Sequence, residues 1–301
     1  MQLHQTISYM KIFLFIIADV YGIEEKLLFS TLNNLKEIDL DTGMVRTLKS
    51  QSGYIYSMAY NHKERYMYVP RYHIGDIVRF PYPNDFTVVF ESIVSASYPV
   101  GISFDSVNNH LYWTELYYPG SVMRCNTDGT DLRVILNETQ PAAIALDMHN
   151  RWIYYGQQIL PSQIFRSNFD GMGITVIIKD LPAKVYGLGV DVNVKRLYWM
   201  EFQTGDLQSA CFNGSDVRTI VSTNAKSKNW DIATDGDFIF YTSSNKIMKI
   251  SKSLQHNPTV VYTDTDIING ILLYKQNGKN TSLKKYYEIQ FILHYSVTII
   301  L

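Results

Sequence analysis

Apolar and polar residues alternate in short segments along most of this chain, a pattern that predicts β-strands. Three such segments follow one another at residues 99–105, 111–115 and 122–127, and they are rich in Tyr, Ile, Val and Trp. Gly, Pro and Asn bound the segments, as they commonly do for β-strands. Because the alternation is strong and helical periodicity is weak, we expect an all-β protein.

The strand pattern repeats along the chain. Residues 99–115 have near copies at 141–156 and 185–201, and degenerate copies surround Asn61 and Asp235. The Asp that ends the first strand of a copy recurs at intervals of 42 to 44 residues, at Asp105, Asp147, Asp191 and Asp235. A period in the low forties with about four short strands per unit is typical of a β-propeller.

The two ends of the repeat region supply one more unit. Residues 27–30 resemble a second strand that lacks a first, and strands at 35–39 and 44–48 follow them. Residues 268–274 resemble a first strand that lacks a second. Joining these pieces leaves no open edge strand. We therefore expect a six-bladed β-propeller over residues 23–274, closed by N- and C-terminal strands that share one blade.

Each well-formed unit also carries a turn between its third and fourth strands. These turns are centred on Asp128-Gly129, Asp170-Gly171 and Asn213-Gly214. Asp-Gly and Asn-Gly favour two-residue hairpins of type I′, in which both central residues have a positive φ. We expect type I′ turns at all three places.

Composition argues against several classes of partner. Lys and Arg number 27 and Asp and Glu 28, so no basic excess attracts nucleic acid or anionic lipid. The seven His residues are scattered without metal-ligand spacing, and no Gly-x-Ser-x-Gly, phosphate-loop or His-Glu-x-x-His motif occurs. We expect no nucleic-acid partner, no cofactor, no metal and no catalytic residues.

Cys125 and Cys211 lie two blades apart, beyond disulfide reach, and are expected to be buried free thiols.

The N-terminal region has the features of a secretory signal peptide. Lys11 precedes the apolar run 12–18, and residues 20–22 offer small or tolerated side chains for cleavage. A buried first strand is the alternative. Three Asn-x-Ser/Thr sequons agree with export and are candidate glycosylation sites: Asn137, Asn213 and Asn280. We expect residues 1–22 to be a signal peptide and the protein to be secreted.

Residues 275–301 do not continue the repeat. The apolar stretch 291–301 has only 11 residues, too few to cross a membrane as a helix, so no membrane span is expected. Three interpretations of this segment stay open: a loose tail, a docking strand, or the end of an incomplete gene model.

The second strands at 111–115 and 197–201, Leu-Tyr-Trp-Thr-Glu and Leu-Tyr-Trp-Met-Glu, resemble the YWTD (class B) repeats of the low-density lipoprotein receptor and related proteins. The Pro-x-Gly-Ile-x-x-Asp lead-in and the Asn-x-Asp-Gly-Thr turn are similar as well. The resemblance implies an extracellular six-bladed propeller, usually one module of a receptor beside Cys-rich EGF-like modules. Two Cys residues cannot build such a module, so this chain differs from the family in being a propeller without EGF-like modules. We expect the propeller to be monomeric.

The resemblance also assigns roles to residues. The repeat motif is expected to be structural, with its aromatic residues in the core and Glu115 and Glu201, in place of the family's Asp, accepting backbone N–H bonds. The motif residues are Tyr112, Trp113, Glu115, Tyr154, Tyr198, Trp199 and Glu201. In the family, one residue per blade faces the mouth of the central channel; that column reads Tyr56, Val100, Ala142, Tyr186, Trp230 and Asn269. The neighbouring loops add Tyr72, His73, Leu116, Tyr117, Phe202 and Gln203.

We interpret the mouth as the place where a protein or peptide ligand binds, at Tyr56, Tyr72, Tyr117, Tyr186, Phe202, Trp230 and Asn269. Tyr and Trp suit protein contact because they give area at small entropic cost; the alternative is that these side chains plug the channel. The expected function is a non-catalytic extracellular protein-binding propeller, similar to the modules that serve in receptor-ligand uptake or Wnt co-receptor signalling. Two alternatives stay open: a propeller hydrolase or lactonase with a channel calcium, and a truncated receptor fragment with a structural role.

Overall fold

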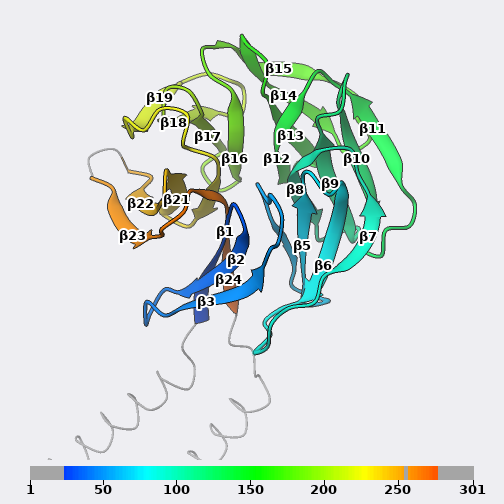
Figure 1. Ribbon diagram of the computed structural model, residues 1–301. Coiled ribbons are helices and arrows are strands. Elements are labelled where there is room, and N and C mark those ends of the chain that lie inside the picture. Colours follow the sequence, from blue (N-terminus) through cyan, green and yellow to red (C-terminus); the bar gives the residue numbers. More distant parts are fainter. Residues whose placement is uncertain (1–23, 254–256, 277–301) are drawn as a thin grey trace, which may run out of the picture. The chain divides into compact units, whose positions relative to one another are not determined.

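The computed structural model describes residues 24–253 and 257–276. These residues form 24 β-strands, and none of them lies in a helix. Within the compact unit Leu27–Tyr274, the strands make six four-stranded sheets arranged around a common centre, as Figure 1 shows. The prediction of an all-β, six-bladed β-propeller is confirmed.

We number the blades in chain order, beginning with the one that both ends of the chain share. Blade 1 has the strand order β24 (Ile268–Gln276), β1 (Glu24–Thr31), β2 (Asn34–Asp39), β3 (Val45–Ser50). Blade 2 contains β4 (Ala59–Asn61), β5 (Tyr66–Arg71), β6 (Asp76–Pro81), β7 (Glu91–Ser95). Blade 3 contains β8 (Pro99–Asp105), β9 (His110–Glu115), β10 (Ser121–Asn126), β11 (Arg133–Asn137).

The other three blades follow the same plan. Blade 4 contains β12 (Pro141–Asp147), β13 (Trp152–Gln157), β14 (Ser162–Asn168), β15 (Thr175–Leu181). Blade 5 contains β16 (Val185–Asp191), β17 (Arg196–Glu201), β18 (Asp206–Cys211), β19 (Arg218–Ser222). Blade 6 contains β20 (Ile232–Asp235), β21 (Phe238–Ser243), β22 (Lys246–Ser251), β23 (Thr259–Thr263).

The ring closes where β24 pairs with β1, as the sequence predicts. The buried hydroxyl of Ser30 accepts a hydrogen bond from the backbone N–H of Gly270 (2.9 Å) and donates one to the carbonyl of Ile55 (2.6 Å). The first contact joins the two ends of the chain, and the second joins blade 1 to blade 2. Thr114, at the same position of blade 3, makes the same pair of contacts within its blade and to blade 4.

The aromatic residues of the repeat motif form the core between blades. Each of them is at most 2 % exposed: Tyr112, Trp113, Tyr154, Tyr198 and Trp199. Trp113 of blade 3 belongs to the same apolar cluster as Tyr68 and Ile77 of blade 2. The large rings therefore fill the space between neighbouring sheets, where flat side chains bury much apolar area.

The predicted type I′ turns are wrong. Asn126 donates its N–H to the carbonyl of Thr130 and accepts the N–H of Gly129, and only Gly129 of the residues between them has a positive φ. This pattern describes a three-residue hairpin that ends on a left-handed Gly. The same bonds recur around Gly171 and Gly214.

The turn glycines also make contact between blades. A Cβ added to Gly129 would lie 2.0 Å from the carbonyl oxygen of Ile93, on β7 of the preceding blade. The same construction at Gly171 would meet the carbonyl oxygen of Ile135 at 2.2 Å. Glycine is therefore required at this turn both for its backbone conformation and for the close approach of the neighbouring blade.

The Asp that ends the first strand ties one blade to the next. The buried carboxylate of Asp105 in blade 3 accepts two hydrogen bonds from the guanidinium of Arg151 in blade 4, at 2.9 and 2.7 Å. Asp191 in blade 5 forms an ion pair with Lys252 of blade 6. A repeated residue that looked like a strand terminator is thus also an inter-blade contact.

The two Glu residues of the motif make contacts inside their own blades. Glu115 accepts a hydrogen bond from the indole N–H of Trp113 at 3.0 Å, and Glu201 accepts one from the hydroxyl of Thr204 at 2.8 Å. Burial raises the pKa of Glu201 above its ordinary value. Both carboxylates are therefore structural, with side-chain donors in place of the backbone donors that we expected.

The signal-peptide prediction for residues 1–22 and most of the tail, residues 277–301 with Asn280, lie outside the described residues. At the described ends of the chain, Lys275 forms an ion pair with Glu25 at 2.8 Å. Over the part of the chain that the structure describes, no helix is long and apolar enough to cross a membrane.

Candidate binding site at the channel mouth

The first strands of the six blades, with the segments just before them, surround a central channel. A cavity of about 250 Å³ in this channel is lined by residues from all six blades. Its polar lining residues are Ser57, Ser103, Tyr186, Asp231 and Thr234. The channel therefore presents hydroxyl groups and one carboxylate along walls that are otherwise apolar side chains and backbone.

Aromatic side chains from blades 2, 3, 5 and 6 gather at one end of the channel. We call this group the mouth cluster: Tyr54, Tyr56, Tyr72, His73, Tyr98, Tyr117, Tyr186, Phe202 and Trp230. All of its members lie in loops or at the start of first strands. Six of the seven residues that the sequence assigned to the mouth belong to it.

Trp230 is the centre of the mouth cluster. Its ring centroid lies 4.6 Å from that of Phe202, 5.0 Å from that of Tyr186 and 5.1 Å from that of Tyr56. From Tyr56 the contacts continue through Tyr72, at 5.6 Å, toward the rim. Because aromatic rings favour tilted and edge-to-face contacts at these distances, the cluster is a packed surface and not a set of independent side chains.

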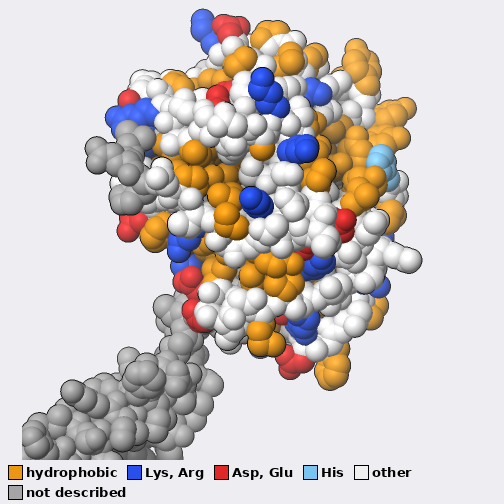
Figure 2. Space-filling model, turned by 60° about the vertical axis from the view of Figure 1, so that its left-hand side comes forward, with side chains coloured by type: hydrophobic (Ala, Val, Ile, Leu, Met, Phe, Trp, Pro, Cys, Tyr) orange, Lys and Arg blue, Asp and Glu red, His pale blue; other side chains and the backbone are white. Residues whose placement is uncertain are grey.

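The other end of the aromatic network is exposed. Tyr72 contacts Tyr98 at 5.2 Å, and Tyr98 stacks on Tyr117 at 6.3 Å. Tyr117 is 66 % exposed, whereas Trp230 is half-buried. The mouth cluster is therefore partly buried at Trp230 and offers aromatic rings to solvent at its edge. Figure 2 shows hydrophobic side chains gathered in several patches on one face of the molecule.

The indole nitrogen at the centre of the cluster is shielded from solvent. The indole Nε1 of Trp230 is inaccessible to solvent and has no hydrogen-bond partner among the described residues. Burial, together with Tyr72 and Tyr54 nearby, raises the pKa of Tyr56 to about 12. Burial also raises the pKa of Tyr186, whose hydroxyl donates to Gln158 Oε1 at 2.7 Å. All these phenols are neutral at physiological pH.

Asn269 is next to Gly270, where an added Cβ would lie 2.9 Å from the backbone carbonyl carbon of Tyr56. Asn269 lies on β24 and is only 5 % exposed. The column residues Val100 and Ala142 are buried as well, at 2 % and 0 %. Sequence reasoning missed Tyr54 and Tyr98. The available signal was their position, since each lies in a loop just before a first strand.

Sequence reasoning also missed Asp231, although its residue type is unusual for its position in the repeat. The corresponding position of the other blades holds a small residue: Ser57, Gly101, Ala143, Gly187 and Gly270. Asp231 is 7 % exposed and accepts the backbone N–H groups of Ile232 (2.9 Å) and Ile271 (3.0 Å). Burial raises the pKa of Asp231 to about 8. Its carboxyl group joins blade 6 to the innermost strand of blade 1.

The alternative of a channel calcium requires acidic side chains that are free to bind the ion. Asp264, in the loop before β24, forms an ion pair with Lys36 at 2.7 Å and accepts the hydroxyl of Tyr262 at 3.1 Å. Among residues 24–253 and 257–276, no group of three or more His, Cys, Asp or Glu side chains is placed to hold a metal ion.

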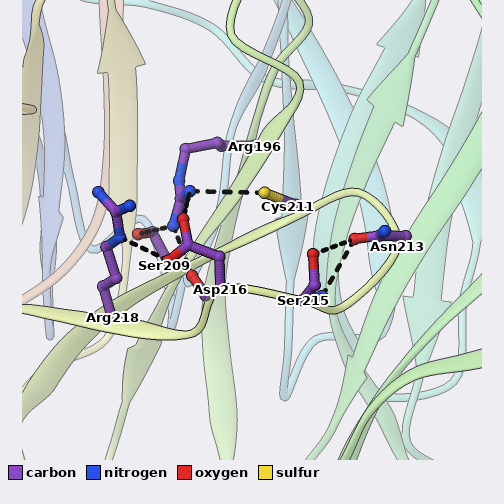
Figure 3. Close-up of polar contacts among 7 residues, drawn as sticks. All are labelled: Arg196, Ser209, Cys211, Asn213, Ser215, Asp216 and Arg218. Carbon is purple, nitrogen blue, oxygen red and sulfur yellow. Dashed lines mark hydrogen bonds and ion pairs between the residues drawn. The ribbon is translucent and has the colours of Figure 1, made fainter.

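The candidate glycosylation sites Asn137 and Asn213 are both exposed. Figure 3 shows Asn213 at the tip of the β18–β19 hairpin, where its Oδ1 accepts the backbone N–H (3.1 Å) and the hydroxyl (2.7 Å) of Ser215. Deeper in the hairpin, Arg196 bonds Asp216 at 2.7 Å and contacts the sulfur of Cys211 at 3.6 Å. Cys125 and Cys211 are free thiols, as expected, but Cys211 is only partly buried.

No protein-family model matches this chain, and no curated protein matches it in sequence. Solved structures match its fold. A chain from the crystal structure of a nidogen/laminin complex aligns with a TM-score of 0.72 at 16 % identity, covering 83 % of this chain and 98 % of that one. A TolB-like protein from Agrobacterium tumefaciens aligns with a TM-score of 0.63 at 10 % identity, covering 85 % and 98 %.

A gluconolactonase from Xanthomonas campestris also aligns with a TM-score of 0.63 at 10 % identity, covering 81 % of this chain and 86 % of its own. At these identities the comparisons establish the fold alone, which is the fold that the resemblance to class B repeats implied. The chain is a six-bladed β-propeller with an aromatic channel mouth, and proteins of different activities share that fold. The function must therefore be argued from the site.

Proposed function

We propose that this protein is a non-catalytic, extracellular binding propeller whose mouth cluster receives a protein or peptide ligand. The observation that carries the proposal is the continuous aromatic surface from Trp230 to Tyr117. Rigid aromatic side chains held by a ring of blades provide contact area at little entropic cost, and binding hot spots favour Trp and Tyr. The nidogen/laminin structure, in which a similar fold occurs in a complex of proteins, supports the proposal.

Substitution of Trp230 tests the proposal. Ligands are selected from a displayed peptide library on the immobilised full chain, and their affinities are then measured for the wild type and Trp230→Ala. Truncation of a central hot spot costs about 2 kcal/mol or more, so we expect affinity to fall roughly thirtyfold at about 1.4 kcal/mol per tenfold. Trp152→Ala is the matched control, because Trp152 is also half-buried but packs against Arg166 in blade 4.

Melting temperatures measured on the same variants distinguish the alternatives. If the mouth cluster is only a plug, Trp230→Ala should cost about 3–5 kcal/mol of stability and leave the affinity of selected ligands unchanged. A channel calcium predicts instead that a chelator lowers the melting temperature of the wild type. Either outcome contradicts the proposal.

A further inference from the structure

Three lysines lie beside the centre of the mouth cluster. The carbonyl of Lys184 accepts the N–H of Phe202 at 2.9 Å, and the carbonyl of Phe202 accepts the N–H of Ser227 at 2.8 Å. Lys226 and Lys228 flank Ser227, and Trp230 follows two residues later. The backbone thus brings Lys184 and the segment of Lys226 and Lys228 next to Phe202, on the chain just before Trp230.

None of these three ammonium groups forms an ion pair or side-chain hydrogen bond within the described residues. Two carboxylates at the same end of the propeller are paired with basic groups, and Glu138 bonds a neutral amide. Asp76 pairs with Arg71, Asp264 pairs with Lys36, and Glu138 bonds Gln157 at 3.2 Å. The three lysines therefore place unpaired positive charges in the segments beside Trp230, although the whole chain has a net charge of −1.

An exposed apolar rim surrounds the rest of the mouth. Its residues and their exposed fractions are Ile74 54 %, Tyr98 44 %, Tyr117 66 %, Ile159 39 % and Leu160 48 %. They come from loops of blades 2, 3 and 4, whereas the three lysines come from segments before blades 5 and 6. One side of the mouth is thus apolar and the other is basic. Grouped apolar side chains on a surface are characteristic of interaction sites.

Resting on the function proposed above, we propose that the ligand of the mouth is an acidic peptide segment with an apolar or aromatic anchor. The anchor seats on the aromatic surface between Trp230 and Tyr72. Asp or Glu residues beside the anchor face Lys184, Lys226 and Lys228. Charge complementarity of this kind sets the choice of partner and the association rate more than the total affinity.

A peptide fits these observations better than a polyanion. Binding to nucleic acid or to an anionic membrane draws on an extended basic surface. Here three lysines border an apolar and aromatic surface, and the chain as a whole carries no basic excess. Unstacked bases and the membrane interface also accept aromatic rings. Those are included in the test.

The peptides selected on the full chain provide the probe. We expect the library to be enriched in sequences with Asp or Glu next to an aromatic or aliphatic residue. Replacing the three lysines by Gln (K184Q, K226Q, K228Q) should weaken these peptides roughly tenfold, mostly through slower association, because each exposed pair contributes little. The loss should shrink as salt is raised. The control K63Q, K195Q removes two positive charges from loops between first and second strands, at the other end of the blades, and should have little effect.

The outcomes separate this inference from the function on which it rests. Neutral or basic peptides that lose affinity with Trp230→Ala but not with the lysine triple variant would overturn the acidic ligand and leave the binding mouth intact. Acidic peptides that are indifferent to Trp230→Ala would overturn the mouth itself. Lysine-dependent binding of duplex DNA, single-stranded DNA or phosphatidylserine vesicles that exceeds the affinity of the selected peptides would overturn the choice of a peptide.

Discussion

The indole ring of Trp230 in blade 6 and the phenol ring of Tyr56 in blade 2 lie with their centroids 5.1 Å apart, although blade 1 separates their blades around the ring. The contact therefore links two blades that share no sheet and no chain connection. Tyr56 also lies against the shared blade, since a Cβ added to Gly270 of β24 would be 2.9 Å from the backbone carbonyl carbon of Tyr56. Ring closure and the candidate site thus occupy the same part of the molecule.

Ring closure gives the first prediction. A truncation before residue 268 removes β24, exposes the edge of β1 and removes the partner of Ser30. We expect a large fall in melting temperature and loss of cooperative unfolding, because an opened propeller has an unpaired edge strand. A truncation after Gln276 keeps β24 and is the control. Equal melting temperatures for the two truncations would contradict closure by a shared blade.

The turn glycines give a prediction with an internal control. Gly171 has a φ of 77°, and an added Cβ would lie 2.2 Å from the carbonyl oxygen of Ile135; Gly43 has a φ of 72° with nothing within 4 Å. Gly43→Ala should cost only the left-handed strain, about 1–2 kcal/mol. Gly171→Ala should cost about 1–3 kcal/mol more through overpacking. Chemical denaturation measures both, and equal costs would show that the blades do not approach closely at this turn.

The tie between blades 3 and 4 should matter more than a surface ion pair. Arg151→Ala leaves the buried carboxylate of Asp105 without its partner, which we expect to cost about 2–3 kcal/mol, since the arginine is partly exposed. Arg133→Ala removes an exposed pair with Asp131 and should cost less than about 1 kcal/mol. Urea unfolding of the two variants gives the comparison. A smaller loss for Arg151→Ala than for Arg133→Ala would rule out this role.

Asp231 makes the stability depend on pH. Its pKa is raised to about 8 in the folded protein, against about 3.9 in an unfolded chain. The folded state therefore holds the proton more tightly, so this contribution is fully present below about pH 4 and is lost as pH rises through about 8. We expect Asp231→Asn to flatten the fall in melting temperature between about pH 5 and about pH 9. Parallel profiles for the variant and the wild type would contradict this assignment.

Export is tested on protein expressed in a eukaryotic secretory host. We expect the chain in the medium to begin near Ile23 and to lose mass on treatment with an N-glycosidase. Asn137 and Asn213 are exposed, so Asn137→Gln and Asn213→Gln should each remove one glycan. N-terminal sequencing and mass spectrometry report the result. A chain that stays inside the cell without glycans would refute export.

Local patterns predicted the repeat, the six blades and the buried aromatic strands, because each blade repeats the same short-range alternation. The turns were predicted less well. Asp128-Gly129 fits two hairpin types, and the three-residue type is adopted while the neighbouring blade approaches Gly129 closely. Contacts between blades have no local signal of this kind, so the partner of Asp105 could not be read from the sequence.

The sequence by itself determined the fold, and its resemblance to class B repeats implied the register that points Tyr56, Tyr186 and Trp230 toward one end of the channel. Only the tertiary structure decided that these rings touch, that Asn269 is buried, and that Asp231 lines the channel cavity. The physical reason is distance along the chain. A blade is specified by residues close in sequence, whereas the mouth is formed where six separate segments converge, and its contacts depend on how the closed ring places them.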